Sequence, residues 1–161
     1  ICEGLVGSEM CIRDRSHSLR QIKMSVDYKK FFREIPEFLK VLGFENGYYD
    51  ENNHEWVTEF LPSEDLTHSN GSIVQGGFVT GMLDAAMAQC IMFKSNGEDL
   101  PLTLDIDVKF LNSCIPDHKV TSRAKIIKQG NSIVFTTANL FQRDDLIATA
   151  SASNKIIKFK F

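Results

Sequence analysis

The chain has 161 residues, of which 43% are hydrophobic and 24% are charged, the balance of an ordinary globular protein. A domain of this size buries roughly two-thirds of the surface that its unfolded chain exposes. The formal net charge is −3, which gives no basic footprint and argues against nucleic acid as a partner. No repeat, linker or low-complexity tract divides the sequence, so a single domain is expected.

Residues 1–23 differ from the rest of the chain because they show no sustained hydrophobic period. The run GLVGSEMCIRDR within them resembles a translated sequencing adaptor, and Met24 is a natural start. We therefore expect residues 1–23 to be a non-native or unstructured segment and residues 24–161 to form the domain. The first segment is also too polar for a secretory signal. The remaining cysteines, Cys90 and Cys114, then indicate reduced thiols and a cytoplasmic protein.

Two elements are predicted at the start of the domain. In residues 25–42 apolar side chains recur at helical spacing with charges opposite, which predicts an amphipathic helix that Pro36 breaks in two. This helix either closes one end of the core or, because aromatic residues line its apolar face, forms a lid over an acyl tunnel. Residues 43–60 follow as a hairpin with its turn at residues 50–53, and residues 61–72 are expected to form a loop.

The next stretch, VQGGFVTGMLDAAMAQCIMF, carries one formal charge in twenty residues, at Asp84. Apolar residues occupy every helical angle, which predicts a helix from about Gly76 to Lys94 that the rest of the fold covers. A spanning segment is disfavoured because a central Asp costs about 3 kcal/mol in a membrane, so no membrane partner is expected. A carboxylate inside a core helix must be paired, wetted by a cleft or used in chemistry.

Strand patterns fill the remainder of the chain. Residues 101–110 alternate strictly between apolar and polar side chains, and longer strands are predicted at residues 120–129, 132–142 and 146–159. Tight turns at residues 129–131 and 143–145 join them. One helix followed by a long antiparallel meander predicts an α+β fold, in which a sheet of five or six strands wraps around the helix.

The glycines that open the helix suggest a binding role. Gly76 and Gly77 leave backbone amides accessible at the positive end of the helix dipole, where they could hold a carbonyl oxygen that gains negative charge. Asp84 lies eight residues beyond Gly76, or about 12 Å along the axis at the usual helical rise. One helix therefore cannot easily direct both groups at one reacting atom. A symmetric dimer, with the helix of one copy facing the glycine turn of the other, removes that difficulty.

The segment GSIVQGGFVTGMLDAAMAQC resembles the catalytic segment of hotdog-fold acyl-CoA thioesterases of the phenylacetate-degradation type. Gly76, Gly77 and Asp84 match that family in identity and spacing. Gln75 stands where many members have His, which resembles a Gln-Gly-Gly subgroup. Asn70 precedes Gln75 by five residues instead of the usual six, so either the loop is shorter or Ser69 is the counterpart. The weaker resemblance of the later strands extends the match over about residues 61–157.

The resemblance implies hydrolysis of an acyl- or aryl-CoA thioester. Asp84 would act as general base for water or as nucleophile, or else it is only a paired residue in a dimer seam. The Gly76 N–H would hold the oxyanion, with Gln75 donating its amide beside it. Because Gln75 does not titrate near neutrality, activity should show one acid limb, set by Asp84, without an inflection near pH about 6.5.

Further site residues follow from the same resemblance. Thr103 would place the attacking water, although it could equally be a surface threonine, and Asn70 would hold water or Asp84. Gly77 and His68 are expected to contact substrate. Five basic residues could contact the phosphates of coenzyme A, and none is assigned: Lys94, Lys109, Arg123, Lys125 and Lys128.

The same family implies a homodimer or homotetramer, with coenzyme A arriving as part of the substrate and no metal or redox cofactor. Cys114, Asp117 and His118 lie close in sequence but lack a second pair of metal ligands. Two alternatives remain. One is a non-catalytic protein that binds or senses acyl-CoA. The other is a hotdog dehydratase or hydratase, which ranks lower because no His follows Asp84 on the helix.

Overall fold

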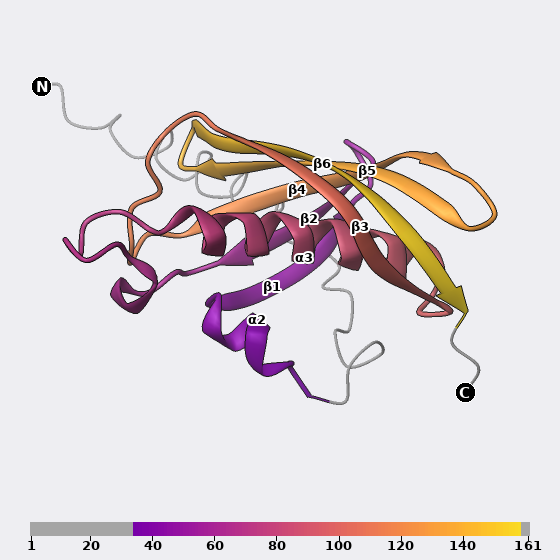
Figure 1. The fold of residues 1–161 in the computed structure, drawn as a ribbon, viewed down its shortest axis with the longest axis horizontal. Coiled ribbons are helices and arrows are strands. Elements are labelled where there is room, and N and C mark those ends of the chain that lie inside the picture. Colours follow the sequence, from indigo (N-terminus) through magenta and orange to yellow (C-terminus); the bar gives the residue numbers. More distant parts are fainter. Residues whose placement is uncertain (1–33, 159–161) are drawn as a thin grey trace, which may run out of the picture.

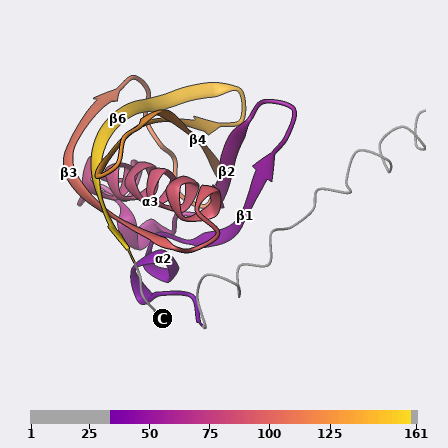
Figure 2. The ribbon, with the colours of Figure 1, turned by 90° about the vertical axis from the view of Figure 1, so that its right-hand side faces the viewer.

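A computed structural model describes residues 34–158. Six antiparallel strands form one sheet, in the order β1-β2-β4-β5-β6-β3, and the sheet curves around a single long helix (Figures 1 and 2). The predicted α+β hotdog architecture is confirmed. The elements are α2 (Glu37–Val41), β1 (Phe44–Asp50), β2 (Glu55–Phe60), the 3-10 helix η2 (Glu64–Leu66), α3 (Gly76–Lys94), β3 (Asp99–Phe110), β4 (Val120–Gln129), β5 (Ile133–Gln142) and β6 (Asp145–Lys158).

The first part of the domain agrees with the predicted break and turn. α2 begins directly after Pro36, while the earlier part of the helix predicted over residues 25–42 lies mainly outside the described residues. β1 and β2 form the expected hairpin, and the Asp50 carboxylate accepts hydrogen bonds from the backbone N–H groups of Asn52 and Asn53. Hydrogen bonds from the Asn53 side chain and from Arg123 help to lower the pKa of Asp50 to about 2.

Helix α3 fills the interior of the curved sheet, as its apolar composition predicts. Met82, Leu83, Ala86 and Met87 are fully buried against the strands. By length and composition α3 could also cross a membrane, a test that core helices of soluble proteins pass as well, and half of its apolar window is buried in the described fold. One side of the helix is less covered than the sequence suggested, and Asp84 is half-buried there.

Strand β3 departs from the strict alternation that its sequence predicts. Thr103 lies opposite Asn154 of β6, and Asp105 lies opposite Ser153, so Leu104 is an extra residue in a β-bulge. Regular alternation would put Thr103 on the same face as Asp105. The bulge separates them, because Thr103 turns toward α3 while Leu104 is 60% exposed.

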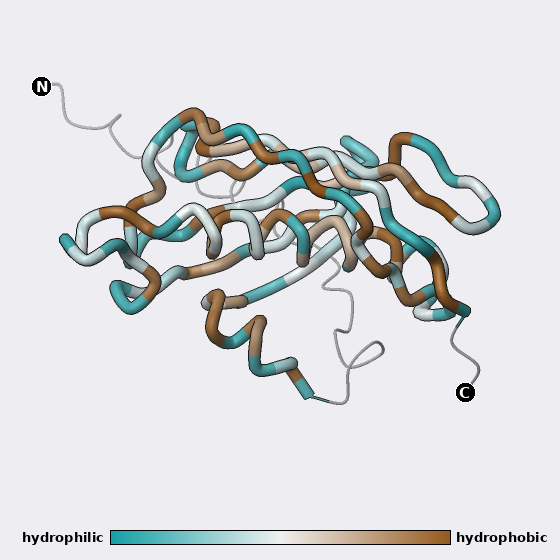
Figure 3. Tube along the Cα trace, viewed as in Figure 1, coloured by the Kyte–Doolittle hydropathy of each residue, from teal (hydrophilic) through white to brown (hydrophobic). Residues whose placement is uncertain are grey.

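The β4–β5 hairpin extends beyond the helix and ends in a hydrophilic tip, at the right of Figure 3. Near the C-terminal end of α3, the side chain of Gln89 is buried among strand residues. Its Oε1 accepts hydrogen bonds from Trp56 Nε1 at 2.9 Å and from the Thr58 hydroxyl at 3.0 Å. This group, Trp56, Thr58 and Gln89, is named the core cluster below.

Candidate active site

Asp84 has a hydrogen-bond partner on the neighbouring edge strand. The Thr103 hydroxyl donates to Asp84 Oδ1 at 2.7 Å. The bulge at Leu104 makes this contact possible, because it turns Thr103 inward at the point where β3 passes α3. The structure thus brings together two of the predicted site residues. Thr103 is itself exposed, and its role in placing the attacking water stays a prediction.

Behind Thr103 the polar contacts continue into the sheet. Asn154, which is completely buried, places its Oδ1 3.3 Å from Thr103 Oγ1 and donates from Nδ2 to Thr136 Oγ1 at 3.0 Å. Neither Asn154 nor Thr136 was predicted from the sequence. A signal was present, since each is a polar residue at an inward position of its strand and the nearest inward residues are apolar. Asp84, Thr103, Asn154 and Thr136 are named the edge cluster below.

The beginning of α3 forms a second group of candidate residues. The backbone N–H groups of Phe78 and Val79 donate to the carbonyl oxygen of Gln75. Those of Gly76 and Gly77 come earlier in the helix and have no backbone acceptor within residues 34–158. They could therefore donate to an oxygen atom of a ligand, and the predicted binding of an oxyanion there stays a prediction.

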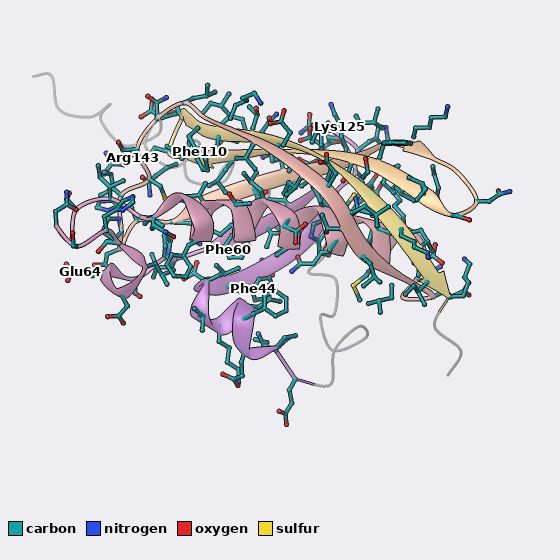
Figure 4. All side chains as sticks on the ribbon, viewed as in Figure 1. Phe44, Phe60, Glu64, Phe110, Lys125 and Arg143 are labelled. Carbon is teal, nitrogen blue, oxygen red and sulfur yellow. The ribbon has the colours of Figure 1, made fainter. Side chains whose placement is uncertain are left out.

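Gln75 lies close to these amides. A methyl group on Gly77 would come within 2.8 Å of Gln75 Oε1, so the Gln75 side chain lies over this glycine. A methyl group on Gly76 would come 3.1 Å from the ring of Phe110, which projects from the end of β3 toward the helix start (Figure 4). The absence of a side chain at both positions lets the Phe110 ring and the Gln75 amide approach the backbone closely.

A pocket of about 500 Å³ opens beside Gly76. His68 and Phe110 line it together with Val79 and the buried Cys114. Burial raises the pKa of the Cys114 thiol to about 11, so this cysteine is not a thiolate nucleophile at neutral pH. The pocket therefore has a mixed wall, in which the polar side chains of His68, Asn112 and Ser113 lie beside apolar residues.

The loop before α3 places its two candidate residues differently. His68 lies in the wall of the pocket, which agrees with its predicted contact with substrate and leaves that contact a prediction. Asn70 is exposed, and its Oδ1 accepts a hydrogen bond from the Ser72 N–H at 3.2 Å. Within one chain Asn70 stabilises the loop, and its predicted contact with water or Asp84 remains untested.

The predicted site residues thus form two groups within one chain. Asp84 and Thr103 lie at the middle of α3, whereas Gln75, Gly76 and Gly77 lie at its beginning. The two groups are about 12 Å apart along the helix axis, and Asp84 does not line the pocket beside Gly76. A single chain does not direct both groups at one reacting atom.

Most of the basic residues considered for phosphate binding are engaged elsewhere. Arg123 forms ion pairs with Asp50 and Glu55, and Lys94 donates to the Tyr49 hydroxyl at 2.7 Å. Lys109 pairs with Asp107, while Lys125 and Lys128 are exposed on β4 (Lys125 is labelled in Figure 4). Residues 34–158 hold no group of three or more His, Cys, Asp or Glu side chains that could bind a metal, Cys114, Asp117 and His118 included.

Comparison with known proteins gave a match to a family model. The model of the thioesterase superfamily matches residues 71–149, from the loop before α3 into β6. None of the curated protein sequences matches the chain at a significant level.

Solved structures share the fold. The phenylacetic acid degradation-related protein of Ralstonia eutropha JMP134 has 21% identity and a TM-score of 0.69, covering 76% of this chain and 91% of its own. The Escherichia coli PaaI protein from the phenylacetic acid degradation operon has 14% identity and a TM-score of 0.66, covering 90% and 92%. A hypothetical thioesterase of Streptococcus pneumoniae TIGR4, solved with coenzyme A, has 11% identity and a TM-score of 0.59, covering 66% and 84%.

Proposed function

Because the chain belongs to the hotdog-fold thioesterase superfamily, we propose that it hydrolyses an acyl- or aryl-CoA thioester to a free acid and coenzyme A. The observation that carries the proposal is the half-buried Asp84 carboxylate on α3, which accepts a hydrogen bond from Thr103 on β3. The first backbone amides of the same helix have no backbone acceptor among the described residues. Coenzyme A in the structure of the Streptococcus pneumoniae protein supports the choice of thioester. The names of the Ralstonia and Escherichia proteins support an aryl group among the substrates.

In the proposed mechanism Asp84 acts as general base. It accepts a proton from a water molecule while the water oxygen attacks the thioester carbonyl carbon. The negative charge that forms on the carbonyl oxygen is stabilised by the Gly76 N–H, with the Gln75 amide beside it. Collapse of this intermediate breaks the carbon–sulfur bond, and the thiolate of coenzyme A takes the proton. Direct attack by Asp84 on the carbonyl carbon is the alternative first step.

The site is proposed to form between two copies of the chain. β3 pairs only with β6 among the described strands, so its other edge has free backbone groups along twelve residues. Leu102, Leu104 and Phe110 on this strand are 44–60% exposed. A long edge strand with exposed apolar side chains can pair with another strand, although Asp105, Asp107 and Lys109 are also exposed on β3. A two-fold axis beside β3 would bring Asp84 of one copy toward Gly76 of the other.

Hydrolysis assays over short, medium, long and aromatic acyl-CoAs test the activity. The Asp84→Asn variant keeps an acceptor for Thr103 and should fold, and its turnover should fall by about 10²- to 10⁴-fold, the usual contribution of a general base. Asp105→Asn, an exposed carboxylate on the same edge strand, is the matched control and should keep normal turnover. Equal turnover in wild type and Asp84→Asn would refute the mechanism.

Mixing two inactive variants tests whether the site is shared. Asp84→Asn and Gly76→Val should each be inactive as homodimers. A hybrid of the two contains one intact site, so random exchange of subunits should restore roughly a quarter of wild-type activity. A mixture that stays inactive, although the subunits are shown to exchange, would place both groups within one chain and contradict the shared site.

The alternative, a protein that binds or senses acyl-CoA, gives a different result in the same samples. It would bind acyl-CoA tightly in calorimetry and release no free thiol with any substrate. That outcome would remove the proposed hydrolase and favour the sensor.

A further inference from the structure

The side chain of Asn154 forms the inner end of the edge cluster and is enclosed there. Asn154 has no exposed surface, and its amide lies between two hydroxyl groups, those of Thr103 on β3 and Thr136 on β5. Thr136 is itself only 1% exposed. A buried amide and a buried hydroxyl in an apolar sheet are costly unless each donor and acceptor has a partner. The arrangement of protons among these groups is therefore constrained.

Counting protons gives two consistent arrangements. The Thr103 hydroxyl has one proton, and at 2.7 Å it is donated to Asp84 Oδ1 when that carboxylate is charged. The lone pairs of Thr103 Oγ1 can then accept from Nδ2 of Asn154, and Oδ1 of Asn154 accepts from Thr136. If Asp84 holds a proton instead, the chain of donors reverses, and Oδ1 of Asn154 faces Thr103.

A half turn of the Asn154 amide interchanges these arrangements, because its oxygen and nitrogen occupy nearly the same space. The structure has Oδ1 toward Thr103 and Nδ2 toward Thr136, so two acceptors, Asp84 Oδ1 and Asn154 Oδ1, face the single proton of the Thr103 hydroxyl. The charged, reactive state needs the opposite orientation. The orientation of one buried amide is thus linked to the charge of Asp84.

We propose that Asn154 is a positioning residue, which in the reactive state donates to Thr103 and thereby commits the Thr103 proton to Asp84 Oδ1. The role rests on the proposed hydrolysis. With Oδ1 held in this way, Oδ2 of Asp84 remains free for the attacking water. Thr136 acts one step further back, since it accepts from or donates to the far end of the same amide.

The other charged side chains of these elements are not placed to set the orientation of the Asn154 amide. The remaining charged side chains of α3, β3, β5 and β6 are exposed or lie at the ends of their elements, namely Lys94, Asp99, Asp105, Asp107, Lys109, Asp145, Lys155 and Lys158. On α2, Glu37 and Lys40 pair with each other.

A pair of neighbouring variants tests the role in catalysis. Thr136→Val removes the anchor of Asn154 without changing the volume of the side chain, and it should lower kcat about fivefold with KM unchanged. Thr137→Val, one residue away on the other face of β5, should change neither quantity. Identical kcat values for Thr136→Val and wild type would overturn the proposal.

A second measurement does not depend on turnover. In protein labelled with ¹⁵N-asparagine, the side-chain amide signals of Asn154 should shift between wild type and Asp84→Asn, because the charge at position 84 sets which end of the amide faces Thr103, whereas Asp105→Asn should leave these signals unchanged. Signals that stay constant would overturn the proposal even if the protein is a thioesterase. A shift with no hydrolysis of any acyl-CoA would instead disprove the proposed function and, with it, the catalytic role of Asn154, while leaving the proton arrangement in place.

Discussion

The edge cluster and the core cluster have similar hydrogen bonds between α3 and a strand, but different roles are expected for them. Each joins one polar residue of α3 to a threonine on a strand: Asp84 to Thr103, and Gln89 to Thr58. Gln89 is 6% exposed and neutral, and Trp56 closes the cluster. Asp84 is half-buried, ionisable and next to an unpaired sheet edge. The enclosed cluster is therefore expected to hold the fold together, and the open one to hold a reactive group in place.

The largest expected effect on stability comes from the core cluster. Gln89→Ala removes the acceptor shared by Trp56 and Thr58 and leaves a cavity, so the free energy of unfolding should fall by about 2 kcal/mol. Chemical denaturation measures it, and kcat per folded molecule should not change. A loss of kcat as large as that in Asp84→Asn would erase the distinction between the clusters.

A matched pair of threonine variants sharpens the comparison. Thr103→Val should lower kcat about tenfold with little change in stability, because it removes a hydrogen bond to a charged group at the exposed edge. Thr58→Val should do the reverse, lowering the free energy of unfolding by about 1 kcal/mol with kcat unchanged. Kinetics and denaturation of both proteins decide the matter, and the comparison is wrong if the two variants behave alike.

The smallest effect is expected at Ser122, which lies opposite Thr58 on β4 and whose hydroxyl has no partner within the described residues. Ser122→Ala should change the free energy of unfolding by less than about 0.5 kcal/mol, since no hydrogen bond is lost. A clear destabilisation would reveal a buried water that bridges Ser122 and the unpaired Gln89 Nε2.

The sequence carried enough information for the fold because its signals are local and repeated. A helix apolar on all sides, strands with alternating side chains and short polar turns each predict an element without reference to the others. The α3 boundaries and the six strands follow the predicted ranges to within about two residues. The Gly-Gly pair and Asp84 likewise lie in one short segment.

The edge cluster could be predicted only in part, because its members come from four separate elements. Thr103 was expected near the site, but its inward orientation depends on a bulge that leaves no mark in an alternating sequence. Asn154 and Thr136 meet through the pairing of β5 with β6, a contact between residues 18 positions apart. Strand register decides that contact, and local patterns do not specify register.

The extra residue in β3 also affects how related chains should be compared. Before Leu104 the even-numbered residues point outward, and after it the odd-numbered ones do. A relative with one residue fewer at this point keeps the equivalents of Thr103 and Asp105 on their respective faces. An alignment gap placed elsewhere in the strand would superimpose buried positions on solvated ones, and would hide the threonine that contacts the carboxylate.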